Sequence, residues 1–469
     1  MLRNLIGGAL LETETPMDVI NPVDETVAGQ VAFAGIAEMD QAVAAAKAAF
    51  ASWRATSFAE RKAVLQAISK AISDNAEELG QLLIKETGRP IGVAQFEVQL
   101  ATQFLDYAAE QVLEPEILFD EPTRRVEAHR NPLGVVAAIV PWNAPLYLAA
   151  NKIGPALIAG NTIVVKPAPT TPLTTLRLGE LIADIVPAGV INIISADNDA
   201  AAHAVAHEDV AKIAFTGSTE TGRKIMAAAA PGLKKLTLEL GGNDAAIVLP
   251  DADVKAIAPA LFGFAFFNSG QVCAVIKRLY VHDSIYDALC TEIAGMASAF
   301  PVGDGADPAV QFGPIQNKAQ YEKVLRYIDI AKQEGRIIAG GEAIEGAGYF
   351  VPLTVVADIS DGAKIVDEEP FGPILPIIRY SDVDEVIARA NASPFGLGGS
   401  VWSADVEAAT AVANRLDSGT IWVNQHCALD PAVPFPTSKQ SGLGVEGGRE
   451  GLYAYTNYKI VNIAKGDAA

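Results

Sequence analysis

The sequence reads Val-Val-Ala-Ala-Ile-Val-Pro-Trp-Asn over residues 135–143, so an apolar run of strand length ends in a turn punctuated by proline. Further apolar runs follow at residues 163–165, 190–194, 213–215 and 236–240. Helical stretches such as 174–185 and 221–229 lie between these runs. This alternation is typical of βαβ units, which build an α/β fold with a parallel sheet covered on both faces. Ligands bind to such sheets beyond the carboxyl ends of the strands.

The segments on either side of this region predict further elements. Residues 38–110 are expected to be helical, because Ala and Leu recur there at spacings of three and four. Ser57 and Glu60 form a capping-box pattern at the start of one of these helices. A second α/β block is expected over residues 245–430, with strands at 279–282, 348–356 and 374–379. The tail over 447–463 is expected to be extended, which makes it a candidate for pairing with another subunit.

Length and composition limit the class of protein. The 469 residues are enough for two or three domains, and 50% of them are apolar, which permits a large core. A formal net charge of −21 argues against nucleic acid or an anionic membrane surface as a partner. No apolar run reaches the roughly 20 residues that span a bilayer. The cysteines, Cys273, Cys290 and Cys427, predict neither a disulfide framework nor a metal site, and so sparse a set is typical of a reducing cytoplasm.

A thiol and a separate carboxylate stand out as candidate catalytic groups. Cys273 follows Gly270-Gln271-Val272, and Glu239 closes an apolar run beside Gly241 and Gly242. Enzymes can use a thiol to attack a carbonyl carbon and form a covalent acyl intermediate. A separate carboxylate then activates the water that releases the acyl group. A buried structural cysteine and a surface carboxylate are the common alternatives for each residue taken alone.

Polar residues also follow three of the predicted strands. Asn143 could donate its amide to a developing oxyanion, or simply lie in a turn between two prolines. Lys166 could bind a nucleotide at the sheet edge, or be a solvated strand end. Ser218 follows Gly217 at a helix start that could receive a diphosphate or be an ordinary capped helix, and no G-x-G-x-x-G fingerprint is present. The histidines form no Ser-His-Asp or metal arrangement by spacing; His203 and His207 are interpreted as one helix face.

Taken together, these motifs resemble those of the aldehyde dehydrogenase superfamily over nearly the whole chain. The most specific strings are Pro-Trp-Asn at 141–143, Phe-Thr-Gly-Ser at 215–218, Glu-Leu-Gly-Gly at 239–242, Gly-Gln-Val-Cys at 270–273 and Glu-Glu-Pro-Phe-Gly-Pro at 368–373. The resemblance implies two Rossmann-like parallel-sheet domains with a small β oligomerisation arm, in a homodimer or homotetramer. It assigns residues 1–118 and 135–240 to an NAD(P)-binding domain, 241–430 to a catalytic domain, and 119–134 and 447–469 to the arm.

The resemblance also implies a role for each catalytic candidate. Cys273 is the expected nucleophile, which forms a thiohemiacetal and then a thioester. Asn143 and the backbone N–H of Cys273 are expected to form the oxyanion hole, and Glu239 to activate the deacylating water. Lys152 and Glu446 match positions associated with the proton path around that base. Members that transfer the acyl group to coenzyme A generally lack the carboxylate of Glu239, so hydrolysis to a carboxylic acid is expected.

The same likeness predicts the cofactor groove. The expected cofactor-binding residues are Trp142, Lys166, Gly217, Ser218, Glu369 and Phe371. Many NAD-preferring relatives carry a glutamate where this chain has Pro169, so NAD is expected while NADP is not excluded. Two further departures are Asn243, in place of the usual lysine, and Pro434-Phe435-Pro436-Thr437, in place of Pro-Phe-Gly-Gly.

The substrate tunnel follows from the resemblance as well. Its expected residues are Ala144, Leu148, Asn151, Phe267, Val272, Ala274, Leu429 and Phe435. None of them is a lysine or arginine that would pair with a substrate carboxylate. The hypothesis is therefore a medium or bulky apolar aldehyde, aromatic or terpenoid-like. The alternatives are a semialdehyde dehydrogenase of the same fold, a non-catalytic relative, and a thiol hydrolase without redox chemistry.

Overall fold

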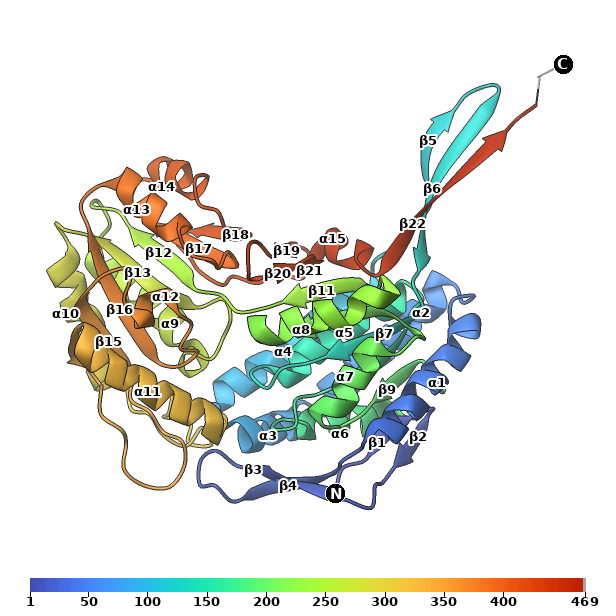
Figure 1. Ribbon diagram of the computed structural model, residues 1–469, viewed down its shortest axis with the longest axis horizontal. Coiled ribbons are helices and arrows are strands. Elements are labelled where there is room, and N and C mark those ends of the chain that lie inside the picture. Colours follow the sequence, from blue (N-terminus) through green and yellow to red (C-terminus); the bar gives the residue numbers. More distant parts are fainter. Residues whose placement is uncertain (467–469) are drawn as a thin grey trace.

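A computed structural model describes residues 1–466 of the chain, and two large sheets dominate it (Figure 1). The first sheet has the strand order β2-β1-β9-β8-β7-β10-β11-β20. Its parallel centre consists of β9 (Ile191–Ile193), β8 (Thr162–Lys166), β7 (Val135–Ile139), β10 (Val210–Thr216) and β11 (Lys235–Glu239). Its antiparallel edges are β1 (Asn4–Ile6), β2 (Ala9–Leu11) and β20 (Gly442–Leu443). The apolar runs expected to be parallel strands are therefore confirmed.

Helices cover both faces of this first sheet. One face carries α2 (Phe58–Asp74), α3 (Ala76–Thr87), α4 (Ile91–Ala109), α5 (Pro145–Ile158) and α6 (Leu173–Ile182). The other carries α1 (Ile36–Trp53), α7 (Asn198–Ala206) and α8 (Thr219–Ala229). Along β7, Val136 and Ala138 pack with the first group, while Val135 and Ala137 pack with the second. Burial on both faces explains why this strand is apolar throughout.

The helical prediction for residues 38–110 is confirmed, including its start signal. The Ser57 hydroxyl accepts a hydrogen bond from the Glu60 backbone N–H at 3.2 Å, and the Glu60 carboxylate accepts one from the Ser57 N–H at 2.7 Å. These reciprocal bonds satisfy backbone donors that would otherwise lack partners in the first turn of α2.

The second sheet has the strand order β14-β15-β16-β13-β12-β17-β18. Its strands are β14 (Arg336–Ala339), β15 (Thr354–Ile359), β16 (Ile374–Tyr380), β13 (Ile276–His282), β12 (Asp244–Val248), β17 (Gly398–Trp402) and β18 (Thr420–Val423). On one face lie α9 (Val254–Phe266) and α10 (Tyr286–Ala299), and on the other α11 (Lys318–Glu334), α13 (Val383–Asn391) and α14 (Val406–Ala413). The short helices are η1 (Ala230–Gly232), η2 (Phe267–Gly270) and α12 (Lys364–Asp367).

The strand expected at 348–356 begins only at Thr354, because the preceding residues form a loop around Gly348, whose φ is +85°.

A separate three-stranded sheet projects away from the rest of the molecule (Figure 1). It consists of β5 (Glu116–Asp120), β6 (Arg124–Pro132) and β22 (Thr456–Ala464). Two small hairpin sheets complete the fold, with β3 (Pro16–Ile20) beside β4 (Val27–Ala32) and β19 (Phe435–Pro436) beside β21 (Val445–Glu446).

The prediction of an extended tail over 447–463 is wrong for its first part. Residues Gly448–Tyr453 form helix α15, and the strand starts only at Thr456. The turn into the helix needs positive φ at Gly447 and Gly448, and Leu452 and Tyr455 then pack into the core. Residues 467–469 of the predicted arm lie outside the described residues.

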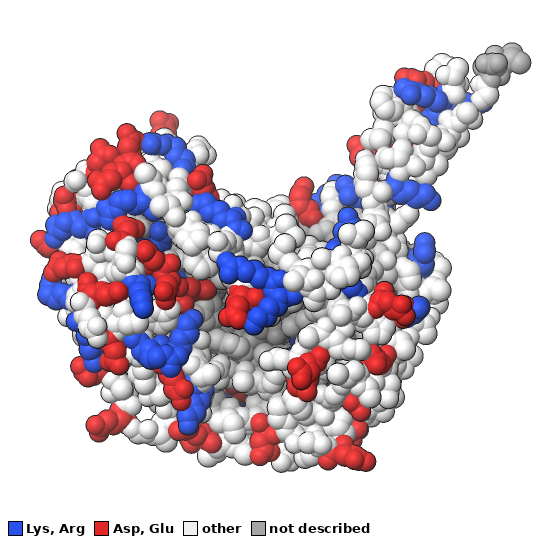
Figure 2. All heavy atoms as spheres, viewed as in Figure 1, with Lys and Arg blue, Asp and Glu red and all other residues white. Residues whose placement is uncertain are grey.

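The predicted fold class, two parallel-sheet units with a small β arm, agrees with this architecture. The expected domain boundary near residue 240 falls on the connection between β11 and β12, which belong to different sheets. Figure 2 shows acidic and basic side chains interspersed on a face that is hollowed between the two lobes. None of the described helices is both long enough and apolar enough to cross a membrane.

Candidate active site

The candidate catalytic residues converge on one cavity of about 270 Å³. Asn143, Glu239, Cys273 and Glu446 all line it. The eight residues expected to form the substrate tunnel line it too: Ala144, Leu148, Asn151, Phe267, Val272, Ala274, Leu429 and Phe435. Their placement around one space fits the tunnel hypothesis, while their individual roles stay predictions.

Cys273 lies at the end of an unusual backbone segment. In η2, Asn268 and Ser269 have φ values of 51° and 55°, in the left-handed region that residues other than glycine rarely adopt. Burial raises the pKa of the Cys273 thiol to about 12, and the nearby Lys277 ammonium opposes this shift. Lys277 also donates a hydrogen bond to the Cys273 carbonyl oxygen. The thiol therefore needs a base to take its proton, or a change in its surroundings, before it can attack as a thiolate.

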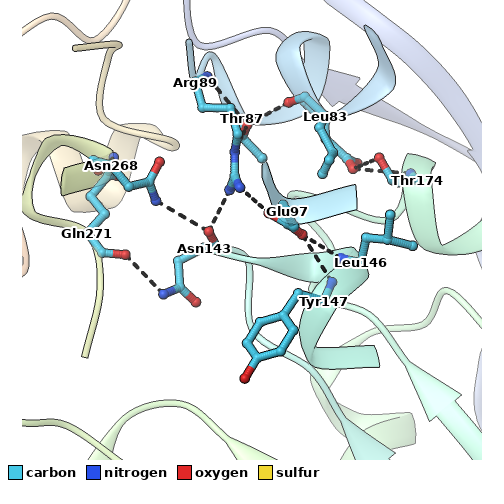
Figure 3. Close-up of polar contacts among 11 residues, drawn as sticks. Leu83, Thr87, Arg89, Glu97, Asn143, Leu146, Tyr147, Thr174, Asn268 and Gln271 are labelled. Carbon is cyan, nitrogen blue, oxygen red and sulfur yellow. Dashed lines mark hydrogen bonds and ion pairs between the residues drawn. The ribbon is translucent and has the colours of Figure 1, made fainter. Parts of the chain in front are cut away.

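Asn143 is held in place from several sides (Figure 3). Its side-chain amide donates to the Gln271 carbonyl oxygen at 2.9 Å, two residues before Cys273 in the chain. Its own carbonyl oxygen accepts from Arg89 at 2.5 Å and from the Asn268 amide at 3.3 Å. An amide nitrogen has two hydrogens, so one N–H of Asn143 is left for a ligand in the cavity.

A buried ion pair connects this asparagine to two helices. Arg89 pairs with Glu97 of α4, and both side chains are almost fully buried, at 3% and 4% exposed. The other oxygen of Glu97 accepts from the backbone N–H groups of Leu146 and Tyr147, at 2.8 and 3.2 Å, in the first turn of α5 (Figure 3). A carboxylate at the N-terminus of α5 satisfies backbone N–H groups that have no partner within the helix. Its negative charge is also stabilised by the positive end of the helix dipole. The sequence contains no motif that marks this pair.

Glu239 is a buried carboxylate with an incomplete set of partners. It is 5% exposed, and its Oε1 atom has no hydrogen-bond partner within the described chain. Burial raises its pKa well above the usual value, the like charge of Glu446 adds to that rise, and Lys152 opposes it. A carboxyl group with a raised pKa and a free oxygen facing a cavity can accept a proton from water near neutral pH.

Lys152 and Glu446 form an ion pair at the cavity wall, of which Glu446 lines the cavity and Lys152 does not. The fully buried Lys152 ammonium lies 2.7 Å from Glu446 and also donates to the Thr216 hydroxyl at 2.7 Å. Asn151 donates to the second oxygen of Glu446 at 2.7 Å. Glu446 thus connects the cavity with a buried lysine, as a proton path requires.

None of the expected cofactor residues is among the cavity-lining residues described. Lys166 is 4% exposed at the end of β8, and burial lowers its pKa to about 8, with Asp197 opposing. Ser218 caps α8 by accepting from the Thr221 N–H, and Gly217 precedes it. The rings of Trp142 and Phe371 meet edge to face, with centroids 5.4 Å apart.

Glu369 is already engaged by groups beside Cys273. Its carboxylate lies 2.9 Å from the Lys277 ammonium and accepts from the Gly242 N–H at 3.1 Å. A Cβ atom at Gly241 would displace this carboxylate, so the glycine lets Glu369 keep its present position. Sequence reasoning missed Lys277, which pairs with Glu369 and whose charge acts on the Cys273 thiol.

Sequence reasoning also missed much of the cavity wall. The additional aromatic residues are Phe96, Phe104, Tyr147, Phe264 and Trp422. They come from α4, α5, α9 and β18, which carry no recognisable motif there. Cys427 lines the cavity as well, and all three cysteines carry free thiols.

The structure brings His203 and His207 together with Asp40, although the sequence interpretation placed both on a helix face. His203 lies on α7 and His207 directly follows it, with Nε2 atoms 2.6 and 3.5 Å from the Asp40 carboxylate. The Nδ1 atom of His207 accepts from the Asp209 backbone N–H at 3.1 Å, which places the ring proton on Nε2. That proton favours a hydrogen bond to Asp40 over coordination of a metal ion.

Comparison with known proteins gives a consistent result. Residues 11–461 match the model of the aldehyde dehydrogenase family. The chain is 38% identical to a phenylacetaldehyde dehydrogenase from Pseudomonas fluorescens, over 98% of this chain and 95% of the relative, and 39% identical to a geranial dehydrogenase from Castellaniella defragrans, over 97% of each. It superimposes with a TM-score of 0.96 on the NAD+ complex of an aldehyde dehydrogenase from Bacillus cereus, at 35% identity, over 99% of this chain and 96% of that one. The chain therefore belongs to the aldehyde dehydrogenase family and is an oxidoreductase that acts on aldehydes.

Proposed function

We propose that the protein oxidises a medium or bulky apolar aldehyde to its carboxylic acid, through a thiohemiacetal and a thioester on Cys273. The observation that carries this proposal is the convergence of Cys273, Asn143 and Glu239 on one cavity with largely apolar walls. A nucleophile, an oxyanion donor and a base around one space are the groups that this reaction needs.

The first step is attack of the Cys273 sulfur on the aldehyde carbon. The free N–H of Asn143 and the backbone N–H of Cys273 would stabilise the oxyanion that forms. Because Arg89, Asn268 and Gln271 hold Asn143 on three sides, this donor needs no reorganisation when the charge develops.

The residues of the cofactor groove fit a nicotinamide dinucleotide. Lys166 is a buried lysine that forms no direct ion pair among the described residues, although Asp197 lies near enough to influence its pKa, and Ser218 stands at the N-terminus of an 11-residue helix. Lys166 would bind the adenosine ribose, Ser218 and Gly217 the diphosphate, and Glu369 the nicotinamide ribose, with Trp142 and Phe371 lining the groove. When bound, the dinucleotide supplies the acceptor for the hydride that the thiohemiacetal loses.

Glu239 would then activate the water that hydrolyses the thioester. Its buried Oε1 atom has no hydrogen-bond partner among the described residues and would accept the proton of that water, and Glu446 with Lys152 would carry the proton away. Hydrolysis by a carboxylate in this position favours a free acid over a coenzyme A thioester as the product.

The substrate class follows from the cavity wall. Among the described lining residues the one cationic side chain is Arg89, which is committed to Glu97 and Asn143. A carboxylate-bearing substrate would find no free cation there, whereas aromatic side chains would pack against an apolar one. The relatives named for phenylacetaldehyde and geranial support the same class.

An aldehyde panel with both nicotinamide cofactors tests this proposal. We expect kcat/KM for phenylacetaldehyde to exceed that for succinate semialdehyde by at least about tenfold. The Cys273→Ala variant should lose all dehydrogenase activity, while Cys290→Ala, which alters a buried cysteine of α10 away from the cavity, should keep it. A preference for succinate semialdehyde would favour the semialdehyde dehydrogenase alternative, and activity in Cys273→Ala would remove the assigned nucleophile.

A further inference from the structure

A chain of buried polar side chains lies behind the substrate cavity. The Trp402 indole N–H donates to the Ser400 hydroxyl at 2.9 Å, and that hydroxyl lies 3.0 Å from Nδ1 of His426. Nε2 of His426 in turn lies 3.5 Å from Oδ2 of Asp244. Ser400 and His426 are 0% exposed, Asp244 is 1% exposed and Trp402 is 2% exposed. The fold thus assembles a Ser-His-Asp arrangement that the spacing of the histidines did not reveal.

The partners along this series are set by chemistry at both ends. An indole nitrogen can only donate, so Ser400 accepts from Trp402, and its hydroxyl can either donate to Nδ1 of His426 or accept a second hydrogen bond from it. Oδ1 of Asp244 accepts from the Gly398 backbone N–H at 3.1 Å. Nε2 of His426 and Oδ2 of Asp244 therefore remain, 3.5 Å apart, and neither has a hydrogen-bond partner among the described residues. Because Ser400 is not among the described cavity-lining residues, it is not a second nucleophile.

The ring of His426 supports the aromatic part of the cavity wall. Its centroid lies 5.0 Å from that of Trp422 and 6.2 Å from that of Phe264, and both of these rings line the cavity. The residues that follow His426 in the chain, from Cys427 to Asp430, also line the cavity. A shift of this single ring would therefore move the wall from both sides.

The loop around His426 needs such an anchor because its backbone is strained. Asn424 and Cys427 have φ values of 53° and 51°, in the left-handed region. Asn424 is fixed by paired hydrogen bonds with the backbone of Ser403, each 2.9 Å long. His426 is the next fixed point before the cavity, and a Cβ atom at Gly398 would collide with both Asp244 and Trp422.

We propose that His426, which contacts the Ser400 hydroxyl and lies beside Asp244, is a positioning residue that sets the specificity of this cavity for bulky apolar aldehydes. The proposal rests on the proposed function, since it concerns the same cavity. Asn143, Glu239 and Cys273 take their positions from other elements, so we expect the effect of His426 to fall mainly on substrate binding.

Substitutions of His426 test the proposal. His426→Phe keeps an aromatic ring but leaves Ser400 without its partner, whereas His426→Gln keeps an N–H donor. His282→Gln is a matched control, since His282 also contacts a serine, Ser284, at 2.8 Å, and a tyrosine ring, but at the end of β13. In His426→Phe we expect KM for phenylacetaldehyde to rise about tenfold, with KM for propanal and for NAD+ unchanged, and His426→Gln to recover part of the loss. His282→Gln should match the wild type.

A binding measurement separates this proposal from the proposed function. Calorimetric titration with phenylacetamide, which has the shape of the aldehyde but cannot be oxidised, should give a Kd about tenfold higher for His426→Phe than for the wild type. This result would support His426 even if the wild type oxidised neither aldehyde. An unchanged Kd, equal losses for phenylacetaldehyde and propanal, or no binding of phenylacetamide by the wild type would each overturn the proposal.

Discussion

Burial disfavours the charged form of both Cys273 and Glu239, yet the proposed chemistry needs each of them charged at some stage. For Glu239 the rise in pKa is useful, because a carboxylate of ordinary basicity would be a poor acceptor for a proton from water. For Cys273 the rise in pKa is an obstacle, and the nearby Lys277 ammonium partly offsets it by favouring the thiolate.

The first prediction concerns Glu239→Gln. Turnover should fall by at least about a hundredfold, while the initial burst of reduced cofactor persists, because only thioester hydrolysis needs the carboxylate. Turnover of the wild type should also rise with pH through the raised pKa of Glu239, since the base acts only when ionised. Rapid-mixing absorbance measurements across a pH series test both points. A burst that vanished together with turnover would mean that Glu239 also deprotonates Cys273.

The second prediction concerns Pro169, which occupies the place of a glutamate in many NAD-preferring relatives. Pro169→Glu should weaken use of NADP+ by about tenfold or more while NAD+ is retained, because a carboxylate beside the ribose repels a 2′-phosphate. Steady-state kcat/KM for the two cofactors measures this ratio. Equal losses with both cofactors would place residue 169 outside the cofactor groove.

At the scale of elements, the connection between α4 and α5 matters most to the site. Arg89 and Glu97 hold both the first turn of α5 and the backbone of Asn143.

The third prediction is that Arg89→Met destabilises the protein by about 3–5 kcal/mol, since it leaves the Glu97 charge buried without a partner. It should also lower kcat. Urea unfolding measures the free energy, and Lys70→Met serves as the control, since it breaks only an exposed pair with Asp74 on α2. Wild-type stability in Arg89→Met would contradict this account.

Helices and strands could be predicted from the sequence where their burial gives a recognisable pattern of apolar residues. β7, β8, β10 and β11 are apolar because both faces are covered, and Ser57 with Glu60 marks the start of α2. Helix α5 gives no amphipathic signal, because 11 of its residues are buried and Pro155 lies inside it. Helix α15 was missed because its short, glycine-rich sequence has little helical character of its own and tertiary packing of Leu452 decides its shape.

The site was predictable only where motifs mark it. Cys273, Asn143 and Glu239 each stand in a specific string, and the structure places all three on one cavity. Phe264, Trp422 and the Arg89–Glu97 pair could not be inferred, because only the folded chain brings these distant segments together. The same holds for His426 and Asp244, which are 182 residues apart in sequence.

At the scale of the whole molecule, the β5-β6-β22 sheet is the feature without an internal partner. It projects from the body (Figure 1) and exposes apolar side chains, with Ile117 at 51%, Phe119 at 48%, Ile460 at 43% and Ile463 at 40%. Exposed apolar side chains that cluster on one element mark an interaction surface. The expected homo-oligomer would cover them.

The fourth prediction follows from this surface. The double variant Ile460→Asp with Ile463→Asp should sediment as a smaller species than the wild type. Burying an unpaired carboxylate in the interface is unfavourable in free energy, so the subunits should associate less tightly. Val406→Asp, at an even more exposed apolar position on α14, should leave the sedimentation coefficient unchanged. A wild type that sediments as a monomer would contradict the prediction.

The proposed reaction depends above all on the covalent step at Cys273, and the Glu239→Gln variant allows this step to be observed directly. After mixing with phenylacetaldehyde and NAD+, proteolysis and mass spectrometry should find one phenylacetyl group, on the peptide that contains Cys273. The peptides of Cys290 and Cys427 should remain unmodified. An acyl group on Cys427, or reduced cofactor formed without any acyl-protein, would contradict the assignment of Cys273 as the nucleophile.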